Sequence, residues 1–175
     1  MARKFIQLSN PSVSLNAPNV AHTLLMKYHP KIPWEMGAHD IIKQHANFAF
    51  RHLVFNCHGF YSRPNFPVPH LSLGTVFHAA NVSAFDPLAS YSSQKVIWLA
   101  ACNLAYTQDG IAFCKLIAQH SNSYVVASIT GCPDVACPAG SILDPGDFSP
   151  YIIDPRGNPI GQPTFRALGG TLGFK

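Results

Sequence analysis

The stretch KVIWLA, residues Lys95–Ala100, indicates the fold class of this 175-residue chain more clearly than any other segment. It belongs to the longest apolar run, Val96–Cys102, and a continuous apolar strand is typical of a central parallel strand that is covered on both faces. Two further apolar segments, His52–Asn56 and Ser123–Ile129, are also predicted as strands. The chain therefore holds three strong candidates for strands of one parallel sheet.

Helical segments are predicted between these strands and before the first one. Apolar residues recur at helical spacing in Glu35–Phe48 and in Asp109–His120. A third helix is predicted over Asp86–Ser93, with Asp86 as its N-cap and Pro87 in its first turn. Because strands that alternate with helices are typical of an α/β fold, we expect a mainly parallel sheet of about four to six strands with helices on both faces.

The N-terminal part and the middle of the chain contain weaker signals. Residues 1–20 are rich in Ser, Asn and Pro and are predicted to form an extended N-terminal arm or one short strand. His22–Tyr28 is predicted as a strand or a helical turn. Residues 60–70 carry three prolines and are predicted as a loop, and Leu71–Val76 is a weak candidate for a pair of strands.

The C-terminal part is predicted to contain a β-hairpin within residues 150–175. Its turn is expected near Asp154–Pro159, and its second strand within Thr164–Phe174. A chain of 175 residues is the size of one domain. We therefore expect residues 1–175 to form a single domain with its core within residues 40–131.

The composition excludes several classes of protein. Hydrophobic residues make up 47% of the chain and charged residues 11%, which argues against a coiled coil and against disorder of the whole chain. The net charge of +4 comes from scattered basic residues, so no nucleic-acid partner is expected. No apolar run approaches the roughly 18 residues that a membrane span needs.

The cysteines and the N-terminus bear on the compartment. Five cysteines are an odd number, and a chain of this length does not need disulfides to fold, so we expect reduced thiols. The first residues lack the apolar core of a signal peptide. We therefore expect a cytoplasmic protein, or one secreted by a route that does not use a signal peptide.

Two short motifs follow predicted strands, CHG at Cys57–Gly59 and ACN at Ala101–Asn103. Ligands of parallel α/β sheets bind beyond the carboxyl ends of the strands, so both motifs can meet at one edge. An imidazole beside a thiol favours the thiolate, which suggests His58 as general acid/base and Cys102 as nucleophile. The backbone N–H groups of Gly59 and Cys102 are candidate donors to an oxyanion. These residues suit acyl transfer through a thioester.

Small residues and chain order fit the same chemistry. The small side chain of Ala100 would let a substrate backbone approach closely. In the papain arrangement the cysteine comes first and the histidine follows far downstream, whereas only His120 follows Cys102 here. If Cys102 is the nucleophile, the histidine must therefore precede it, as His58 does.

With these residues the chain resembles the caspase-like cysteine peptidases of clan CD. The resemblance rests on LVFNCHG at Leu53–Gly59 and VIWLAAC at Val96–Cys102. It covers about residues 40–131. Further residues are similar to the bacterial CHAT-like domains found near the start of some very large surface proteins: Leu73-Gly74, CNLA at Cys102–Ala105, Gly110, Phe113, Ala118 and Val125–Gly131.

The resemblance implies a caspase-like fold and a Cys-His dyad without a required third residue. His58 would be the general acid/base, Cys102 the nucleophile and Gly59 an oxyanion donor. It also implies a protein or peptide substrate whose strand lies beside residues 125–130, which makes Ser128 and Thr130 candidate substrate-binding residues. By analogy with the bacterial branch, the protein is expected to be an effector or a processing protease, with no metal and no cofactor.

The chain departs from the family at the position that selects the substrate side chain. Many members carry an acidic or polar residue two positions before the cysteine, where this chain has Ala100. The preference for the residue before the cleaved bond therefore cannot be transferred. Asp134 is the nearest acidic candidate for binding a basic side chain there.

Other interpretations remain open at this stage. The domain can be a catalytically silent binding or regulatory module, with Cys102 as an inert core thiol. Cys57 and Arg63 have the C-x5-R spacing of cysteine phosphatases, but the prolines that follow cannot form the phosphate-binding helix. Cys132 and Cys137 lack the two downstream ligands that a zinc site needs. The remaining histidines are expected at the surface or in loops.

Overall fold

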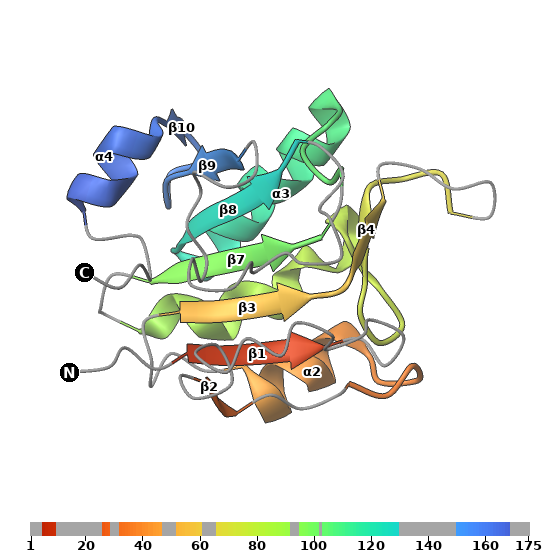
Figure 1. The fold of residues 1–175 in the computed structure, drawn as a ribbon. Helices are drawn as coiled ribbons and strands as arrows, with labels where there is room; N and C mark the ends of the chain where they lie inside the picture. The colour runs from red at the N-terminus through yellow and green to blue at the C-terminus, as the bar shows by residue number, and fades with distance from the viewer. Residues whose placement is uncertain are drawn as a thin grey trace.

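The computed structural model describes residues 5–9, 26–28, 32–46, 52–60, 66–91, 95–101, 103–129 and 150–168. Within these residues the chain forms a seven-stranded sheet, a smaller three-stranded sheet and several helices (Figure 1). The α/β class predicted from the sequence is confirmed. No helix in the described part of the chain has both the length and the apolar character needed to cross a membrane.

The large sheet is mostly parallel and has the strand order β10-β9-β8-β7-β3-β1-β2. Strands β2, β1, β3, β7 and β8 are parallel to their neighbours, while β9 is antiparallel to β8 and β10 to β9. Strand β7 lies at the centre, as predicted. The bounds are β1 Phe5–Ser9, β2 Met26–Tyr28, β3 His52–Asn56, β7 Val96–Ala100, β8 Tyr124–Ser128, β9 Pro150–Ile153 and β10 Pro159–Ile160.

The sheet is larger than predicted because both ends of the chain contribute strands. The expected four to six strands become seven, since β1 and β2 extend the sheet beyond β3. Residues 5–9 pair with β3 on one side and β2 on the other, so the short strand predicted as one alternative for residues 1–20 is confirmed as an inner strand. The strand predicted as one alternative for His22–Tyr28 is confirmed over Met26–Tyr28. Parallel pairing to β3, which local sequence does not reveal, explains the difference.

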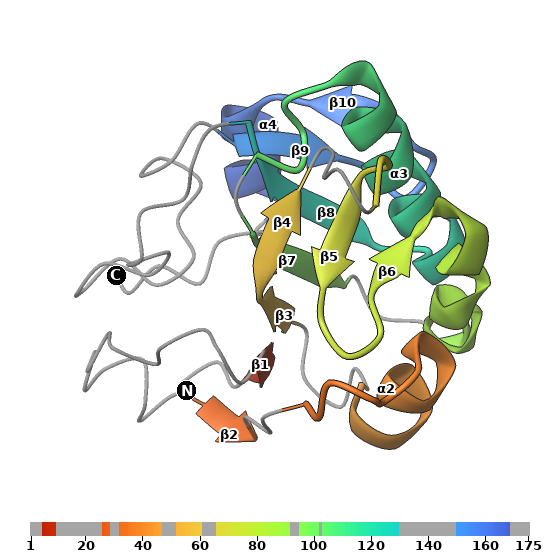
Figure 2. The ribbon, with the colours of Figure 1, turned by 90° about the vertical axis from the view of Figure 1, so that its right-hand side faces the viewer.

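Alternation along the strands produces two buried faces. Leu53, Phe55, Ile97 and Leu99 face the main core beneath helices α2 (Ala38–His45), η1 (Ala79–Ser90) and α3 (Gln108–Ser121). These three helices lie along one face of the sheet (Figure 2). On the other face, Phe165 of helix α4 (Gln162–Ala167) packs edge-on against Trp98, with ring centroids 5.8 Å apart.

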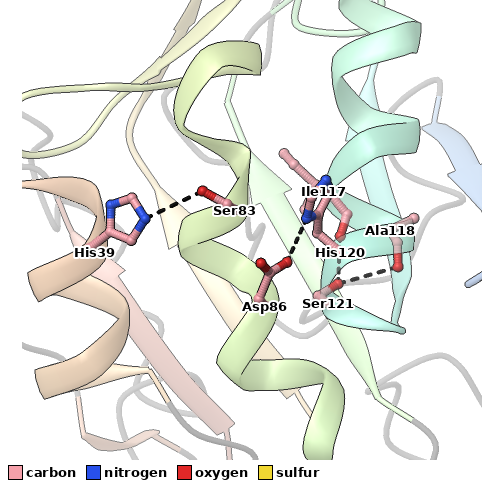
Figure 3. A network of polar contacts seen from close by, with 7 residues as sticks. All are labelled: His39, Ser83, Asp86, Ile117, Ala118, His120 and Ser121. Atoms are coloured by element: carbon pink, nitrogen blue, oxygen red, sulfur yellow. Dashed lines mark hydrogen bonds and ion pairs between the residues drawn. The ribbon is translucent and has the colours of Figure 1, made fainter.

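Two contacts between polar side chains link the three helices on their exposed side (Figure 3). Ser83 Oγ of η1 lies 3.4 Å from His39 Nε2 of α2. Asp86 Oδ1 of η1 lies 2.5 Å from His120 Nδ1 of α3. Helix η1 therefore sits between its neighbours and contacts both of them through side chains as well as through packing.

A helix is present where one was predicted over Asp86–Ser93, but its predicted first residue is wrong. η1 is a 3₁₀ helix that begins at Ala79, so Asp86 and Pro87 lie inside it. Its first turn is held by Asn81, whose Oδ1 accepts from the His78 N–H and whose Nδ2 donates to the Val76 carbonyl. The Asp86 carboxylate contacts His120 instead of capping a helix. The Asp-Pro pair therefore did not mark the N-terminus of the helix, because Asp86 makes a tertiary contact that the local sequence does not show.

The three-stranded sheet lies across the carboxyl ends of the central strands (Figure 2). It consists of β4 (His58–Phe60), β5 (His70–Ser72) and β6 (Phe77–His78), in the order β4-β5-β6 and antiparallel throughout. The weak strand pair predicted at Leu71–Val76 is confirmed only in part, because β6 begins at Phe77. Strand β4 was not predicted, since three residues carry too little local signal.

The C-terminal hairpin is confirmed in position, but its second strand is shorter and earlier than predicted. Strand β10 is Pro159–Ile160, and the residues assigned to a strand from Thr164 onward form α4 as far as Ala167. In the turn, Asp154 Oδ1 accepts from the backbone N–H groups of Arg156 and Asn158 at 2.9 and 2.8 Å. The helix replaces the expected strand because Phe165 is buried against Trp98.

Candidate active site

The two sequence motifs leave the sheet from neighbouring strands. β3 and β7 are parallel and in continuous register, from His52 opposite Val96 to Asn56 opposite Ala100. His58 follows Asn56 by two residues, and Cys102 follows Ala100 by two residues. Cys102 lies outside the described residues, as does the side chain of Ala100. The two strands that precede the motifs are therefore neighbours, and the meeting of the motifs themselves at one sheet edge stays a prediction.

His58 opens the small sheet directly after β3. It is the first residue of β4, and its side chain is exposed. Across the strand pair it lies opposite Ser72, while the buried Gly59 lies opposite the buried Leu71. His58 and Ser72 therefore share the outer face of the small sheet, whereas Gly59 and Leu71 are on the face toward the core.

The direction of the Gly59 N–H follows from a hydrogen bond on strand β6, the strand on the other side of β5. The His78 N–H donates to Asn81 Oδ1, so it is directed away from β5. His70 and His78 are thus a pair without mutual ladder bonds, and the bonded pair is Leu71 with Phe77. Because Leu71 bonds toward β6, the opposite residue Gly59 directs its N–H and C=O away from β5.

The turn that follows Cys102 is firmly anchored. The Ala105 N–H donates to the Ser128 carbonyl at 3.0 Å, and the Tyr106 N–H donates to the Asn103 carbonyl at 3.1 Å. Asn103 takes the left-handed conformation, with φ of 53°. Thr107 then caps α3 by accepting from the Gly110 N–H at 3.1 Å. The connection from the candidate nucleophile to the next helix is therefore held at both ends.

Strand β8 offers no open edge where the resemblance places the substrate strand. Val125–Ala127 pairs with β7 on one side and β9 on the other. Ser128 is fully buried, lies opposite Pro150 and uses its carbonyl to bind Ala105. A substrate strand beside residues 125–128 is thus wrong for this structure. Thr130 and Asp134 lie outside the described residues.

The two cysteines within the described residues, Cys57 and Cys114, are buried. Burial raises the pKa of the Cys114 thiol to about 12, so it stays protonated near neutral pH. Cys57 is also buried, and the chain continues from it into strand β4 rather than into a phosphate-cradling loop. Arg63, Cys132 and Cys137 lie outside the described residues. Nothing in the described part of the chain favours the phosphatase interpretation.

Two of the histidines expected at the surface or in loops are buried in strands. His52 accepts a hydrogen bond from the Trp98 indole N–H, with 3.0 Å between Nε1 and Nδ1. His70 donates from Nδ1 to the Val68 carbonyl at 2.8 Å, and its ring lies edge-on to Phe66. The prediction was wrong for both because each imidazole satisfies a polar atom inside the fold, which the sequence pattern does not show.

Neither a search for metal-binding groups nor comparison with known proteins assigns a function to this chain. Among the residues that the structure describes, no group of three or more His, Cys, Asp or Glu side chains is arranged to hold a metal ion. No protein-family model matches the chain, and a comparison with curated proteins finds no significant match.

Ser72 is the residue near His58 that the sequence interpretation missed. The alternation His70-Leu71-Ser72, with the apolar residue between two polar ones, is a signal that could have placed Ser72 on the polar side of a strand. Its partner strand, however, is set by the antiparallel pairing with His58–Phe60. The neighbour of His58 could therefore be identified only from the fold.

Proposed function

We propose that this protein is a cysteine endopeptidase, with Cys102 as nucleophile and His58 as general acid/base. The observation that carries the proposal is the parallel register of β3 and β7, in which Asn56 lies opposite Ala100. Each candidate catalytic residue follows its strand by the same two-residue step. One thiol and one imidazole from adjacent strand ends are the minimum that a thiol peptidase needs.

The reaction proceeds in two stages. The Cys102 thiolate attacks the carbonyl carbon of the cleaved peptide bond, and His58 gives its proton to the leaving nitrogen as the C–N bond breaks. The product of this stage is a thioester. His58 then takes a proton from water, whose oxygen attacks the thioester carbon. The C–S bond breaks, the carboxylic acid leaves, and the proton returns to the His58–Cys102 pair.

The Gly59 amide supports the same proposal because of its direction. Its N–H is directed away from β5, off the edge of the small sheet that begins at the end of β3. A backbone N–H that no strand within the described residues uses can donate to the oxyanion that forms in each stage, and such donors stabilise the transition state strongly. The second donor in the proposal is the N–H of Cys102.

The resemblance to caspase-like peptidases, and to CHAT-like domains in particular, is part of this proposal. A mostly parallel α/β sheet with helices packed along its core face is compatible with it. So is the placement of both motifs after central strands. The proposed substrate is a protein or peptide, and the proposed role is that of a bacterial effector or processing protease.

A cleavage assay on a random peptide library tests the proposal. The wild-type chain is expected to cleave a subset of peptides, while Cys102→Ala and His58→Ala lose cleavage and keep the folded circular dichroism spectrum. Cys57→Ala is the matched thiol control and is expected to retain cleavage. If none of the peptides is cleaved and His58→Ala does not change the reactivity of Cys102 toward iodoacetamide, the protein is instead a silent binding or regulatory module.

A further inference from the structure

The outer face of the small sheet presents a polar side chain directly across from His58. Strands β4 and β5 lie side by side (Figure 2). They pair so that His58 lies opposite Ser72, and the next pair, Gly59 and Leu71, is buried. Since side chains alternate along a strand, His58 and Ser72 project from the same face. Ser72 is half-buried and His58 is exposed.

The pairing type sets how far apart these two residues are. The Gly59–Leu71 pair has no mutual ladder bonds, as the His78–Asn81 hydrogen bond requires. The adjacent pair, His58 and Ser72, is then the hydrogen-bonded one, with Cα atoms about 5.5 Å apart. Side chains at this separation are close enough to interact across the strands.

The other polar side chain on this face of β5 has a different role. His70 Nδ1 donates to the Val68 carbonyl, and its ring packs at 4.6 Å from Phe66. His78, opposite His70, packs against the same Phe66 ring at 5.2 Å. No Asp or Glu occurs in residues 52–60 or 66–78. Within the described small sheet, a carboxylate is therefore not available to orient His58.

We propose that Ser72 is a positioning residue for His58. Its hydroxyl accepts a hydrogen bond from the N–H of one ring nitrogen, which leaves the other nitrogen without a proton and favours the tautomer that can take the thiol proton. Ser72 does not touch the reacting atoms. It acts only through His58, and this inference rests on the proposed Cys-His chemistry.

The test is the pH dependence of iodoacetamide labelling at Cys102, measured by peptide mapping. Wild type, Ser72→Ala, Ser72→Thr and His58→Ala are compared, with Ser83→Ala as control because Ser83 also neighbours a histidine, His39. Ser72→Ala is expected to slow labelling below pH 7 by about fivefold, as for one lost hydrogen bond. Ser72→Thr restores the wild-type profile, and Ser83→Ala leaves it unchanged.

A second readout, the two-bond ¹H–¹⁵N spectrum of the His58 ring, does not depend on reactivity. Ser72→Ala is expected to change the tautomer ratio of His58, and Ser72→Thr to restore it. If Ser72→Ala matches wild type in both measurements while His58→Ala slows labelling, the positioning role is overturned and the dyad stands. If His58→Ala also has no effect on labelling, the proposed function itself fails, and the positioning role fails with it.

Discussion

Gly110 lies against the backbone carbonyl of Leu104, so closely that a Cβ atom on Gly110 would be 1.8 Å from the carbonyl oxygen. This contact joins the first turn of α3 to the turn that follows Cys102. The Ala105–Ser128 and Thr107–Gly110 hydrogen bonds hold the same turn. The candidate nucleophile is therefore followed by a segment with little freedom to adjust, as expected for a site that must be held in place.

Gly110→Ala is expected to displace this turn, because neither backbone can move away cheaply. We expect a loss of about 1–3 kcal/mol in the free energy of unfolding, as for overpacking of a filled site. We also expect slower labelling of Cys102. Urea unfolding and thiol labelling measure the two effects. Gly37→Ala is the control, because its nearest heavy atom would be an ordinary 3.8 Å away. Equal stability of the two variants would contradict the prediction.

The cysteines are expected to react in a fixed order. Cys102 should be alkylated first at neutral pH, because the proposed dyad keeps part of it as thiolate. Cys57 is buried, and Cys114 is buried with a pKa raised to about 12. Mass spectrometry after brief exposure to iodoacetamide gives the order. Labelling of Cys57 or Cys114 before Cys102 would show that the nucleophile is assigned wrongly.

The part of the fold that the sequence predicted best consists of elements with strong local patterns. The strand over Val96–Ala100 and the helix over Gln108–Ser121 match their predicted ranges within one residue. The strand is a continuous apolar run and the helix carries an apolar stripe at helical spacing, so tertiary contacts did not need to be known. Adjacency of β3 and β7 also followed from the strand–helix–strand order.

The parts that were missed depend on contacts between distant segments. Strands β4 and β6 have three and two residues, and they exist as strands because they pair with β5. The closed edges of β8 depend on β9, whose pairing places Ile153 opposite Val125. For the candidate site, sequence reasoning could therefore locate the two motifs. It could not find Ser72 beside His58 or exclude a substrate strand along β8.

Lys95 is expected to make stability depend on pH in the alkaline range. Its buried Nζ donates to the Leu88 carbonyl at 2.8 Å and to the Ser121 carbonyl at 3.2 Å, near the ends of two helices. Burial lowers the pKa of Lys95 below its ordinary value of 10.5. Between the folded pKa and 10.5 the unfolded chain binds more protons, so rising pH stabilises the folded state in that window.

Lys95→Met removes this titration together with both hydrogen bonds. We expect the variant to be less stable by about 1–3 kcal/mol, because two buried carbonyls lose a donor. The difference from wild type should widen as the pH rises toward 10.5, since only the wild type gains. Urea unfolding at several pH values, compared pairwise, cancels the other titrating groups. A difference that stays constant with pH would refute the proposed burial effect on Lys95.

Asp154 is expected to stabilise the C-terminal hairpin in its charged form only. Although burial by itself raises the pKa of this carboxyl, the hydrogen bonds from Asn158 and Arg156 outweigh it and lower the pKa below the ordinary 3.8. The stabilisation is therefore present above pH 3.8 and is lost as the pH falls through the lower, folded-state value.

Asp154→Ala should lower the free energy of unfolding by about 1 kcal/mol at pH 7, in line with other side-chain caps of backbone N–H groups. Thermal unfolding of both proteins from pH 7 to pH 2 checks this. The two stabilities should converge at the acid end, whereas a gap that persists there would mean that Asp154 acts through packing rather than charge.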